Sequence, residues 1–251
     1  MLNCGLVALL PLFAEQSNLH SLVTSRTADP AAPSLPAQWQ HGGYQVLALP
    51  PPPWRDLPLP SVRSAMSSWY DWTRSPPSMR ETYHDECVPI FQNGSAWSCD
   101  FLNVNGTSYL LQHEDRAAGQ PECCVFARPW SPPRPDFPST LFFLENTTEE
   151  SVGGDTVMWF QSRGVTPQEG GPFGYGYRVR LPAPAAAAAG SGPTLVPFAF
   201  YFGALWNRAN GTVDQAYTVQ YFQDWQDKQP DASVWDLPPS CSTAVACTNF
   251  S

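Results

Sequence analysis

Hydrophobic and polar residues alternate with a period of two along several short stretches of this chain, which is typical of half-buried antiparallel β-strands. The clearest stretch is 175–181, where aromatic and aliphatic residues alternate with glycine and arginine. Two further stretches, 198–203 and 217–222, alternate in the same way and are separated by Asn210-Gly211-Thr212. We therefore expect a long hairpin in the C-terminal part of the chain.

A second group of short apolar runs lies between Cys87 and Leu111, where Asn93-Gly94 and Asn105-Gly106 separate three runs. Asn-Gly between β-prone runs is a strong hairpin signal, because both central residues of a type I′ turn need positive φ. The pattern predicts a β-meander whose tips are exposed.

Further strands are expected at 44–49, 68–72, 79–91, 122–127, 140–144 and 156–161, with an acidic connection over 146–150. The 28 prolines are crowded before residue 61 and around 129–138, which favours extended segments over long helices. The sequence therefore predicts an all-β, mostly antiparallel fold with few short helices and a Pro-rich N-terminal arm.

The chain divides into four expected parts. Residues 1–14 are interpreted as a signal peptide with an apolar core from Leu6 to Phe13, and no later apolar run is long enough to span a bilayer. Residues 15–60 form the Pro-rich arm with one strand at 44–49, residues 61–241 form the β domain, and residues 242–251 form a C-terminal tail.

Cysteine usage points to an oxidising compartment. Removal of the signal peptide deletes Cys4 and leaves six cysteines, which suggests three disulfides among fifteen possible connectivities: Cys87, Cys99, Cys123, Cys124, Cys241 and Cys247. Adjacent residues on a strand point to opposite faces, so Cys123 and Cys124 are expected to have different partners.

Glycosylation sequons support the same compartment. Five of the chain's asparagines begin Asn-X-Ser/Thr without proline: Asn93, Asn105, Asn146, Asn210 and Asn249. We expect a glycoprotein in the extracellular space or in the lumen of the secretory pathway or lysosome.

The charge balance excludes some partners. Lys and Arg number 13 against 22 Asp and Glu, which gives a formal net charge of −9. Without a basic cluster, nucleic acid and anionic membrane surfaces are poor partners. The oligomeric state is not defined by the sequence, and a dimer is compatible with it.

Several features follow one another along residues 65–241: Tyr70-Asp71-Trp72 followed by Arg80, a Cys123 strand leading to Pro129-Trp130, Trp159, the hairpin from Phe198 to Tyr221, and Trp235-x-x-Pro-x-x-Cys241. In this order they resemble the ependymin-related proteins and their plant and protist relatives, whose fold is a LolA/LolB-like open half-barrel. The chain departs from that pattern in its Pro-rich arm, in an Ala/Gly-rich insert at 183–193 and in Cys247.

The resemblance implies a curved antiparallel sheet, forming an open half-barrel or a sandwich, folded over an apolar pocket. It also implies N-glycosylation, disulfides and extracellular or lysosomal residence. Lipids or other hydrophobic ligands are associated with such pockets, and calcium is associated with some members. No catalytic residue transfers, and no cofactor is expected otherwise.

Large aromatic residues are the candidates for lining this pocket, although each could instead fill a closed core: Trp69, Trp72, Trp159, Phe198, Phe200, Phe202, Tyr217 and Tyr221. Asn103 and Gln220 are polar positions that could hydrogen-bond a ligand head group.

Catalytic and metal chemistry find weaker support. In His84-Asp85-Glu86 and His113-Glu114-Asp115, neighbouring side chains alternate faces on a strand, so we expect solvated charges and no metal site. No Gly-x-Ser-x-Gly motif is present, and the carboxylate pair of a glycosidase is not singled out among Asp71, Glu81, Asp85, Asp155 and Asp224.

The sequence therefore predicts a secreted, non-enzymatic protein that binds a hydrophobic, lipid-like molecule. Two alternatives remain: an extracellular-matrix or cell-wall interaction protein without a ligand, and a secreted hydrolase. A continuous apolar cavity favours the first function, a collapsed core favours the second, and a polar cleft with paired carboxylates favours the third.

Overall fold

The structure is a computed structural model that describes residues 29–48, 63–87, 97–113, 116, 119–149, 154–162, 173–182, 193–207 and 213–247. Several expectations lie outside these residues: the signal peptide at 1–14, the insert from 183 to 192, and the sequons at Asn93, Asn210 and Asn249.

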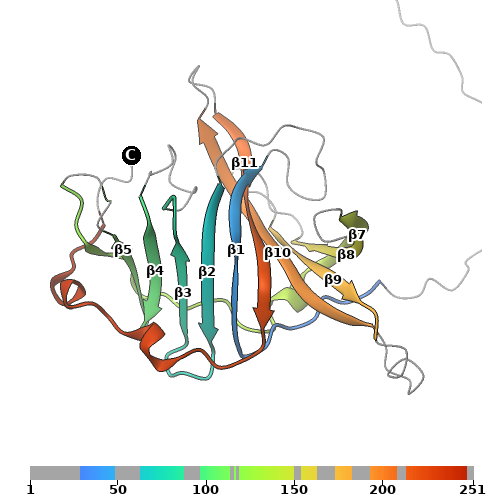
Figure 1. Cartoon of the computed structure of the whole chain (residues 1–251), viewed down its shortest axis with the longest axis horizontal. Helices are drawn as coiled ribbons and strands as arrows, with labels where there is room; N and C mark the ends of the chain where they lie inside the picture. The colour runs from blue at the N-terminus through green and yellow to red at the C-terminus, as the bar shows by residue number, and fades with distance from the viewer. Residues whose placement is uncertain are drawn as a thin grey trace, which may run out of the picture. The chain divides into compact units, whose positions relative to one another are not determined.

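The described part of the chain forms one open antiparallel sheet of eleven strands (Figure 1). The strands are β1 (Gln38–Ala48), β2 (Arg63–Asp71), β3 (Ser78–Tyr83), β4 (Cys99–Val104), β5 (Thr107–Gln112), β6 (Cys123–Ala127), β7 (Phe142–Glu149), β8 (Asp155–Gln161), β9 (Gly174–Arg180), β10 (Thr194–Asn207) and β11 (Val213–Gln226). Three short 3-10 helices accompany them: η1 (Phe137–Thr140), η4 (Ala232–Trp235) and η5 (Pro239–Thr243). The all-β, antiparallel prediction is confirmed.

The strand order is β6-β5-β4-β3-β2-β1-β11-β10-β9-β8-β7. The chain thus starts at the centre of the sheet and meanders to one edge. It then crosses to the other edge through the Pro-rich segment, and it meanders back until β11 pairs with β1. The sheet includes residues from 38 onward, and so it includes part of the segment that the sequence placed in the N-terminal arm.

The sheet is strongly curved. Gln220 on β11 donates a hydrogen bond from Nε2 to Oε1 of Glu81 on β3, at 3.1 Å, although β1 and β2 lie between these strands. In a flat sheet, three strand spacings would separate the two backbones by about 14 Å. The sheet therefore bends toward the face that carries both side chains, which we call the concave face.

The hairpin expected at Asn105-Gly106 is confirmed. It joins β4 to β5 with Val104 opposite Thr107, and Asn105 and Gly106 have φ values of 53° and 72°. Both central residues therefore have the positive φ that a type I′ turn requires. Asn105 is exposed at the tip, as expected for a sequon.

Two strand boundaries were predicted wrongly. The strand expected over 79–91 ends at Tyr83, and a bend over 84–86 follows. The acidic connection expected at 146–150 is instead the second half of β7, which pairs with β8 up to Glu149 opposite Asp155. Continuous pairing with β8 and the β-branched Thr147 and Thr148 explain why this polar segment is a strand.

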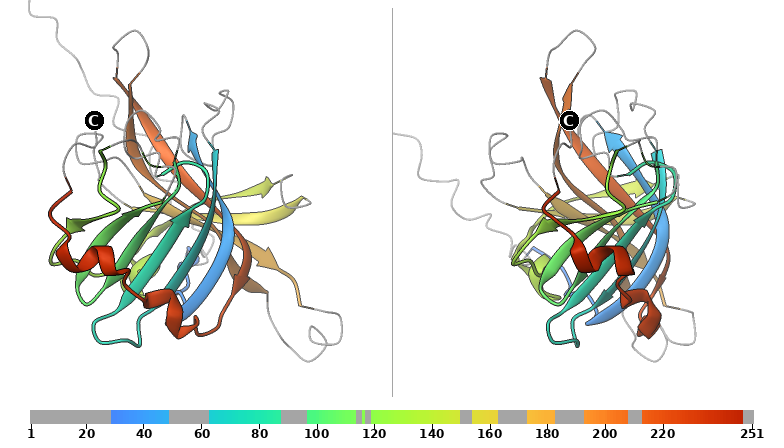
Figure 2. Two further views of the ribbon diagram at one scale, coloured as in Figure 1. Left: turned by 60° about the vertical axis from the view of Figure 1, so that its left-hand side comes forward. Right: turned by 90° about the vertical axis from the view of Figure 1, so that its left-hand side faces the viewer.

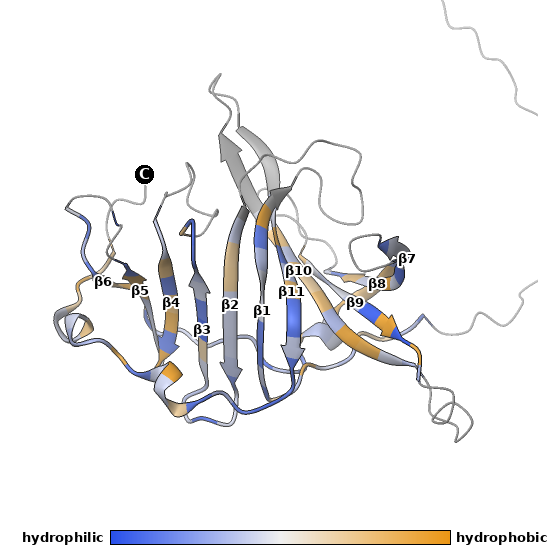
Figure 3. Ribbon diagram, viewed as in Figure 1, coloured by the Kyte–Doolittle hydropathy of each residue, from blue (hydrophilic) through white to orange (hydrophobic). Residues whose placement is uncertain are grey.

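Side chains on both faces of the sheet are buried, and alternating apolar and polar bands are visible along β4 and β9 (Figure 3). The register of β10 against β9 shifts between Pro197 and Ala199. Because of this bulge, Phe198 joins a cluster with Trp159 and Tyr201, whereas Phe200 contacts Tyr175 on the concave face. The simple alternation expected over 198–203 is therefore interrupted at its start.

Three disulfides cross-link the described residues: Cys87–Cys99, Cys123–Cys241 and Cys124–Cys247. Cys123 and Cys124 have different partners, as predicted. The Cys123–Cys241 bridge holds the C-terminal segment against the convex face, where η4 and η5 lie across the outer side of the sheet (Figure 2). Cys124 lies in the cross-strand row of Glu81, Phe101 and Leu110, so its bridge to Cys247 is on the concave side. Three disulfides are typical of an oxidising, non-cytosolic compartment.

Candidate ligand-binding site

A cavity of about 210 Å³ lies on the concave face, and we call it the concave cavity. Most of its lining is aromatic: Trp39, Tyr83, Phe101, Phe126, Trp130, Tyr175, Phe200, Phe202, Phe222 and Trp225. These side chains come from both halves of the sheet, because its curvature brings β3 and β4 to face β9 and β10. The cavity is therefore a product of the bend in the sheet.

The Pro-rich segment between β6 and β7 contributes Trp130 and Pro133 to the lining. Tyr70 donates its hydroxyl to the carbonyl of Pro133 at 2.7 Å, and the Trp130 amide donates to the carbonyl of Gly106 at 3.0 Å. The amide of Leu35, another lining residue, donates to the carbonyl of Pro135 at 2.8 Å. Sheet side chains and backbone thus hold this irregular segment against the concave face.

A group of polar side chains lies among the aromatic residues. Glu81 accepts one hydrogen bond from Gln220 Nε2 at 3.1 Å and another from the Tyr83 hydroxyl at 3.2 Å. Gln220 Nε2 also lies 3.1 Å from Gln45 Oε1. Desolvation raises the pKa of Glu81 above its ordinary value, and the two hydrogen bonds oppose this effect only in part.

His41 is a buried aromatic partner on the same face. Its Nδ1 lies 2.8 Å from the carbonyl of Gly42, and its ring is stacked at 5.4 Å on Trp39 and at 5.6 Å on Trp225. Burial lowers the pKa of His41 to about 4, although the backbone hydrogen bond favours the charged form. The ring is therefore neutral near pH 7, with Nδ1 as the donor to Gly42.

Three polar atoms of the lining have no hydrogen-bond partner within the described structure: Ser68 Oγ, Asn103 Oδ1 and Trp39 Nε1. All three residues are at least 95% buried, with exposed fractions of 1%, 5% and 5%. Buried polar groups are nearly always satisfied in proteins, so orphaned atoms around one cavity suggest a missing partner such as a ligand.

The structure places four residues singled out from the sequence in this lining: Phe200, Phe202, Asn103 and Gln220. Four others, Trp159, Phe198, Tyr217 and Tyr221, form a separate cluster with Val219. Trp69 packs with Trp235 beneath the C-terminal segment, and Trp72 stacks on Tyr70 with ring centroids 6.4 Å apart. Ordinary alternation along the strands places Trp69, Trp159, Tyr217 and Tyr221 on the opposite face, and the bulge after Pro197 places Phe198 there as well.

Trp39, His41 and Tyr175 line the cavity but were not predicted from the sequence to do so. Glu81 was one of five carboxylates that the sequence did not distinguish from one another. Trp39 and His41 lie two residues apart at the start of β1, a spacing that indicates one face of a strand. This spacing could have indicated that both side chains lie on one face of a strand. The run Gln38–Gly43, however, is polar and Gly-rich, which is not typical of a core strand.

The His–carboxylate clusters do not form metal sites in the described part of the chain, where no three His, Cys, Asp or Glu side chains are placed to hold an ion. His84 and Asp85 are exposed; His84 Nε2 lies 3.1 Å from Ser67 Oγ, and Asp85 accepts the Ala65 amide. Glu114 and Asp115 lie outside the described residues.

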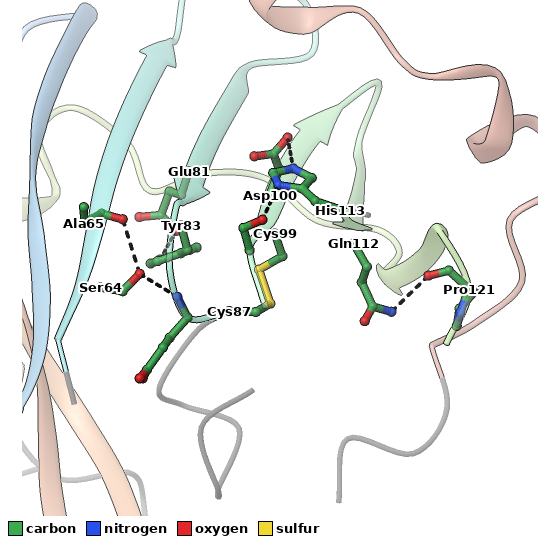
Figure 4. Close-up of a disulfide and its surroundings, with 12 residues drawn as sticks. Ser64, Ala65, Glu81, Tyr83, Cys87, Cys99, Asp100, Gln112, His113 and Pro121 are labelled. Carbon is green, nitrogen blue, oxygen red and sulfur yellow. Dashed lines mark hydrogen bonds and ion pairs between the residues drawn. A yellow bond between two sulfur atoms is a disulfide. The ribbon is translucent and has the colours of Figure 1, made fainter. Parts of the chain in front are cut away.

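His113 and Asp100 lie near the Cys87–Cys99 bridge (Figure 4), and together with Ser98 they form an arrangement of serine, histidine and aspartate. Its Nδ1 lies 2.9 Å from Ser98 Oγ, and its Nε2 lies 3.5 Å from Asp100 Oδ2. Arg80 forms an ion pair with the same Asp100 oxygen and donates to the carbonyl of Val234. Arg80 thus occupies the Asp100 oxygen that would otherwise orient the His113 imidazole. Because Arg80 also contacts Val234, Asp100 helps to hold the C-terminal segment in place.

No family model and no curated protein matches this chain. Among solved structures, the complex of MucA and MucB from Pseudomonas aeruginosa is similar with a TM-score of 0.32 and 13% sequence identity. The match covers 81% of this chain, and the chain spans 56% of the matched one. Similarity at this level defines neither a family nor a function.

The fold and the site define a class: an all-β, disulfide-bonded protein with an aromatic cavity on the concave face of an open sheet. The described helices are short 3-10 turns, and none has the length or apolar character that a membrane-spanning helix needs.

Proposed function

We propose that this protein binds a small, mostly apolar molecule in the concave cavity, in the lumen of the secretory pathway or lysosome or outside the cell. The observation that carries the proposal is an aromatic-lined cavity with three buried polar atoms that have no hydrogen-bond partner among the described residues. Ligand sites in proteins are typically apolar concavities with a few convergent polar groups.

The size of the cavity narrows the ligand. An apolar cavity of about 150 Å³ is large enough for benzene, and drug-sized ligands need about 300 Å³ or more. At about 210 Å³, the concave cavity suits a compact molecule of one or two rings, or the end of a longer lipid chain. The resemblance to the ependymin-related proteins and the LolA/LolB-like half-barrel supports a hydrophobic ligand of this kind.

The alternatives receive less support. A scaffold protein without a ligand would be expected to have a collapsed core in place of this cavity. A hydrolase of the glycosidase type needs two carboxylates across a cleft, and Glu81 is the single carboxylate among the described lining residues.

Native mass spectrometry of the secreted protein, together with extraction into organic solvent, tests for a bound molecule. The same purification is repeated with Phe202→Lys, which places a charge in the concave cavity. Val196→Lys is the matched control, because Val196 is a half-buried residue of the same strand outside this lining. We expect a co-purifying apolar molecule with the wild type and with Val196→Lys, and none with Phe202→Lys. Absence of any such molecule from wild-type protein made in several hosts would contradict the proposal.

Glycosylation is part of the same proposal. Asn105 at the β4–β5 turn and Asn146 on β7 are both exposed, so a transferase could reach either sequon. Treatment of the secreted protein with a peptide N-glycosidase is expected to lower its mass and to convert Asn105 to aspartate. An unchanged mass would count against passage through the secretory pathway of a eukaryotic cell.

A further inference from the structure

We propose that the molecule bound in the concave cavity is a small organic ammonium ion with an aromatic or aliphatic body, and that Glu81 pairs with its charged nitrogen. This inference rests on the proposed function, since it names the class of ligand that the same cavity would take. Three features of the cavity point to such a ligand: the arrangement of hydrogen-bond acceptors, the lack of a cationic side chain among the described lining residues, and the aromatic walls.

The acceptors are neighbours on adjacent strands. Ser68 lies directly opposite Glu81 in the ladder between β2 and β3, so their Cβ atoms are about 5 Å apart on one face. Asn103 is the diagonal neighbour of Glu81, since Phe101 pairs with Glu81 and Asn103 follows two residues later on β4. Glu81, Ser68 Oγ and Asn103 Oδ1 therefore offer oxygen atoms to one region of the cavity.

These oxygen atoms have spare capacity. Ser68 Oγ and Asn103 Oδ1 have no partner in the described structure, and the Glu81 carboxyl accepts only two hydrogen bonds, both from neutral groups. A carboxylate can accept about four. A primary ammonium carries three N–H donors and no acceptor, so it matches a site that is rich in acceptors.

No cationic side chain neutralises Glu81 within the described lining, which contains neither lysine nor arginine. The other titratable groups of the lining are His41, which is neutral near pH 7, and the hydroxyls of Tyr83 and Tyr175. A half-buried carboxylate that faces an aromatic cavity without a positive partner is costly, and a cationic ligand would remove that cost. An anionic ligand such as a fatty acid would add a second negative charge instead.

Aromatic walls suit the same ligand. Trp39, Trp225, Tyr175 and Phe200 line the cavity around the polar group, and ring faces attract cations at short range. A neutral apolar molecule would also pack against these rings, so the aromatic residues support binding in general. The carboxyl group and the orphaned acceptors are what favour a cation.

The test compares three probes that share one phenyl ring and a short chain: 2-phenylethylamine, 2-phenylethanol and 3-phenylpropionate. Titration calorimetry and quenching of tryptophan fluorescence measure binding to wild-type protein, to Glu81→Gln and to Glu122→Gln. Glu122 is exposed and lies outside the concave cavity, so the last variant is a matched control for loss of one carboxylate. Near-UV circular dichroism checks that each variant is folded.

We expect the amine to bind wild-type protein about tenfold or more tightly than the alcohol, the range for a hydrogen bond to a charged group. The carboxylate is expected not to bind measurably. Glu81→Gln should abolish the preference for the amine while it leaves the affinity for the alcohol unchanged, and Glu122→Gln should change neither.

The outcomes separate the two proposals. Equal or tighter binding of the alcohol by wild-type protein, or an amine preference that survives in Glu81→Gln, overturns the ammonium inference and leaves the proposed function intact. Failure of the wild type to bind any probe or any extracted molecule overturns both. The comparison of amine with alcohol in the wild type decides the matter even if Glu81→Gln does not fold.

Discussion

His41 and Glu81 lie in one cross-strand row of the concave face, separated only by Ser68. His41 pairs with Ser68 in the ladder between β1 and β2, and Ser68 pairs with Glu81 in the ladder between β2 and β3. Burial favours the neutral form of both outer groups, so it lowers the pKa of the histidine and raises that of the carboxyl. The two residues therefore make the stability of the protein depend on pH in opposite directions.

Replacement of His41 by phenylalanine is expected to remove a loss of stability in acid. The histidine pKa is about 4 in the folded protein and near 6.5 when unfolded, so the unfolded chain binds more protons between these values. The free energy of unfolding therefore falls as pH decreases from 6.5 to 4, by about 3 kcal/mol. Urea unfolding at a series of pH values measures this decrease in the free energy of unfolding. The His41→Phe variant should have a flatter profile over this interval, and a profile parallel to that of the wild type would contradict the prediction.

Replacement of Glu81 by glutamine is expected to raise the free energy of unfolding at neutral pH more than at pH 4. The raised pKa means that the folded protein holds its proton above the ordinary value of 4.5, where the unfolded chain has released it. The free energy of unfolding of the wild type therefore falls as pH rises from 4.5 through the folded pKa, and it stays lower above that. Glu81→Gln should be more stable than the wild type at neutral pH, and this advantage should shrink toward pH 4.

Urea unfolding at pH 4 and at pH 7.5 measures the advantage, with Glu122→Gln as the control. If Glu81→Gln were less stable by the same amount at both pH values, the carboxyl would not be stabilised in its neutral form in the folded protein.

The local features of this fold could be predicted from the sequence, because short-range signals encode them. Asn105-Gly106 is an example: the conformational preference of two residues is enough to define the turn. The separate partners of Cys123 and Cys124 followed in the same way from the alternation of side chains along a strand.

The cavity could not be predicted in detail, because it depends on curvature and on a bulge. Phe198 and Phe200 are two residues apart and read as one face, yet the register shift places them on opposite faces. Pro197 was the available signal, since proline within a sheet is confined to edges and bulges. Glu81 lies between Arg80 and Thr82, and nothing in this local sequence distinguishes it from the other carboxylates. Only the bend that brings Gln220 toward Glu81 places it in a cavity.

The two C-terminal disulfides are expected to contribute non-additively to stability. Cys123–Cys241 and Cys124–Cys247 close loops of 118 and 123 residues that almost coincide. Either bridge alone therefore removes most of the same chain entropy from the unfolded state. Removal of one bridge by paired Cys→Ser substitutions should cost about 2 kcal/mol, and removal of both about 7 kcal/mol.

Non-reducing urea unfolding measures these costs. The paired replacement of Cys87 and Cys99, which close a loop of 12 residues, is the reference and should cost about 3 kcal/mol. If removal of the second C-terminal bridge lowered the free energy of unfolding by the same amount as removal of the first, the two bridges would not restrict the same loop of the unfolded chain.

Arg80 is expected to stabilise the protein by holding the C-terminal segment to the convex face. Its Nη1 donates to the carbonyl of Val234 at 2.9 Å, and its Nη2 forms the ion pair with Asp100, whose side chain is only 3% exposed. The Arg80→Met variant leaves that carboxylate buried without its cation, which should cost about 2 to 3 kcal/mol, since the arginine is itself a quarter exposed. Urea unfolding measures the loss, and limited proteolysis should show faster cleavage near Val234.

The double variant Arg80→Met with Asp100→Leu separates the two contributions of Arg80. If the main cost of Arg80→Met is the unpaired carboxylate, removal of that carboxylate should recover most of the lost stability. Proteolysis near Val234 should remain fast in the double variant, because the hydrogen bond from Arg80 to the Val234 carbonyl is still missing. Recovery of the proteolytic resistance together with the stability would mean that the disulfides, and not Arg80, hold η4 in place.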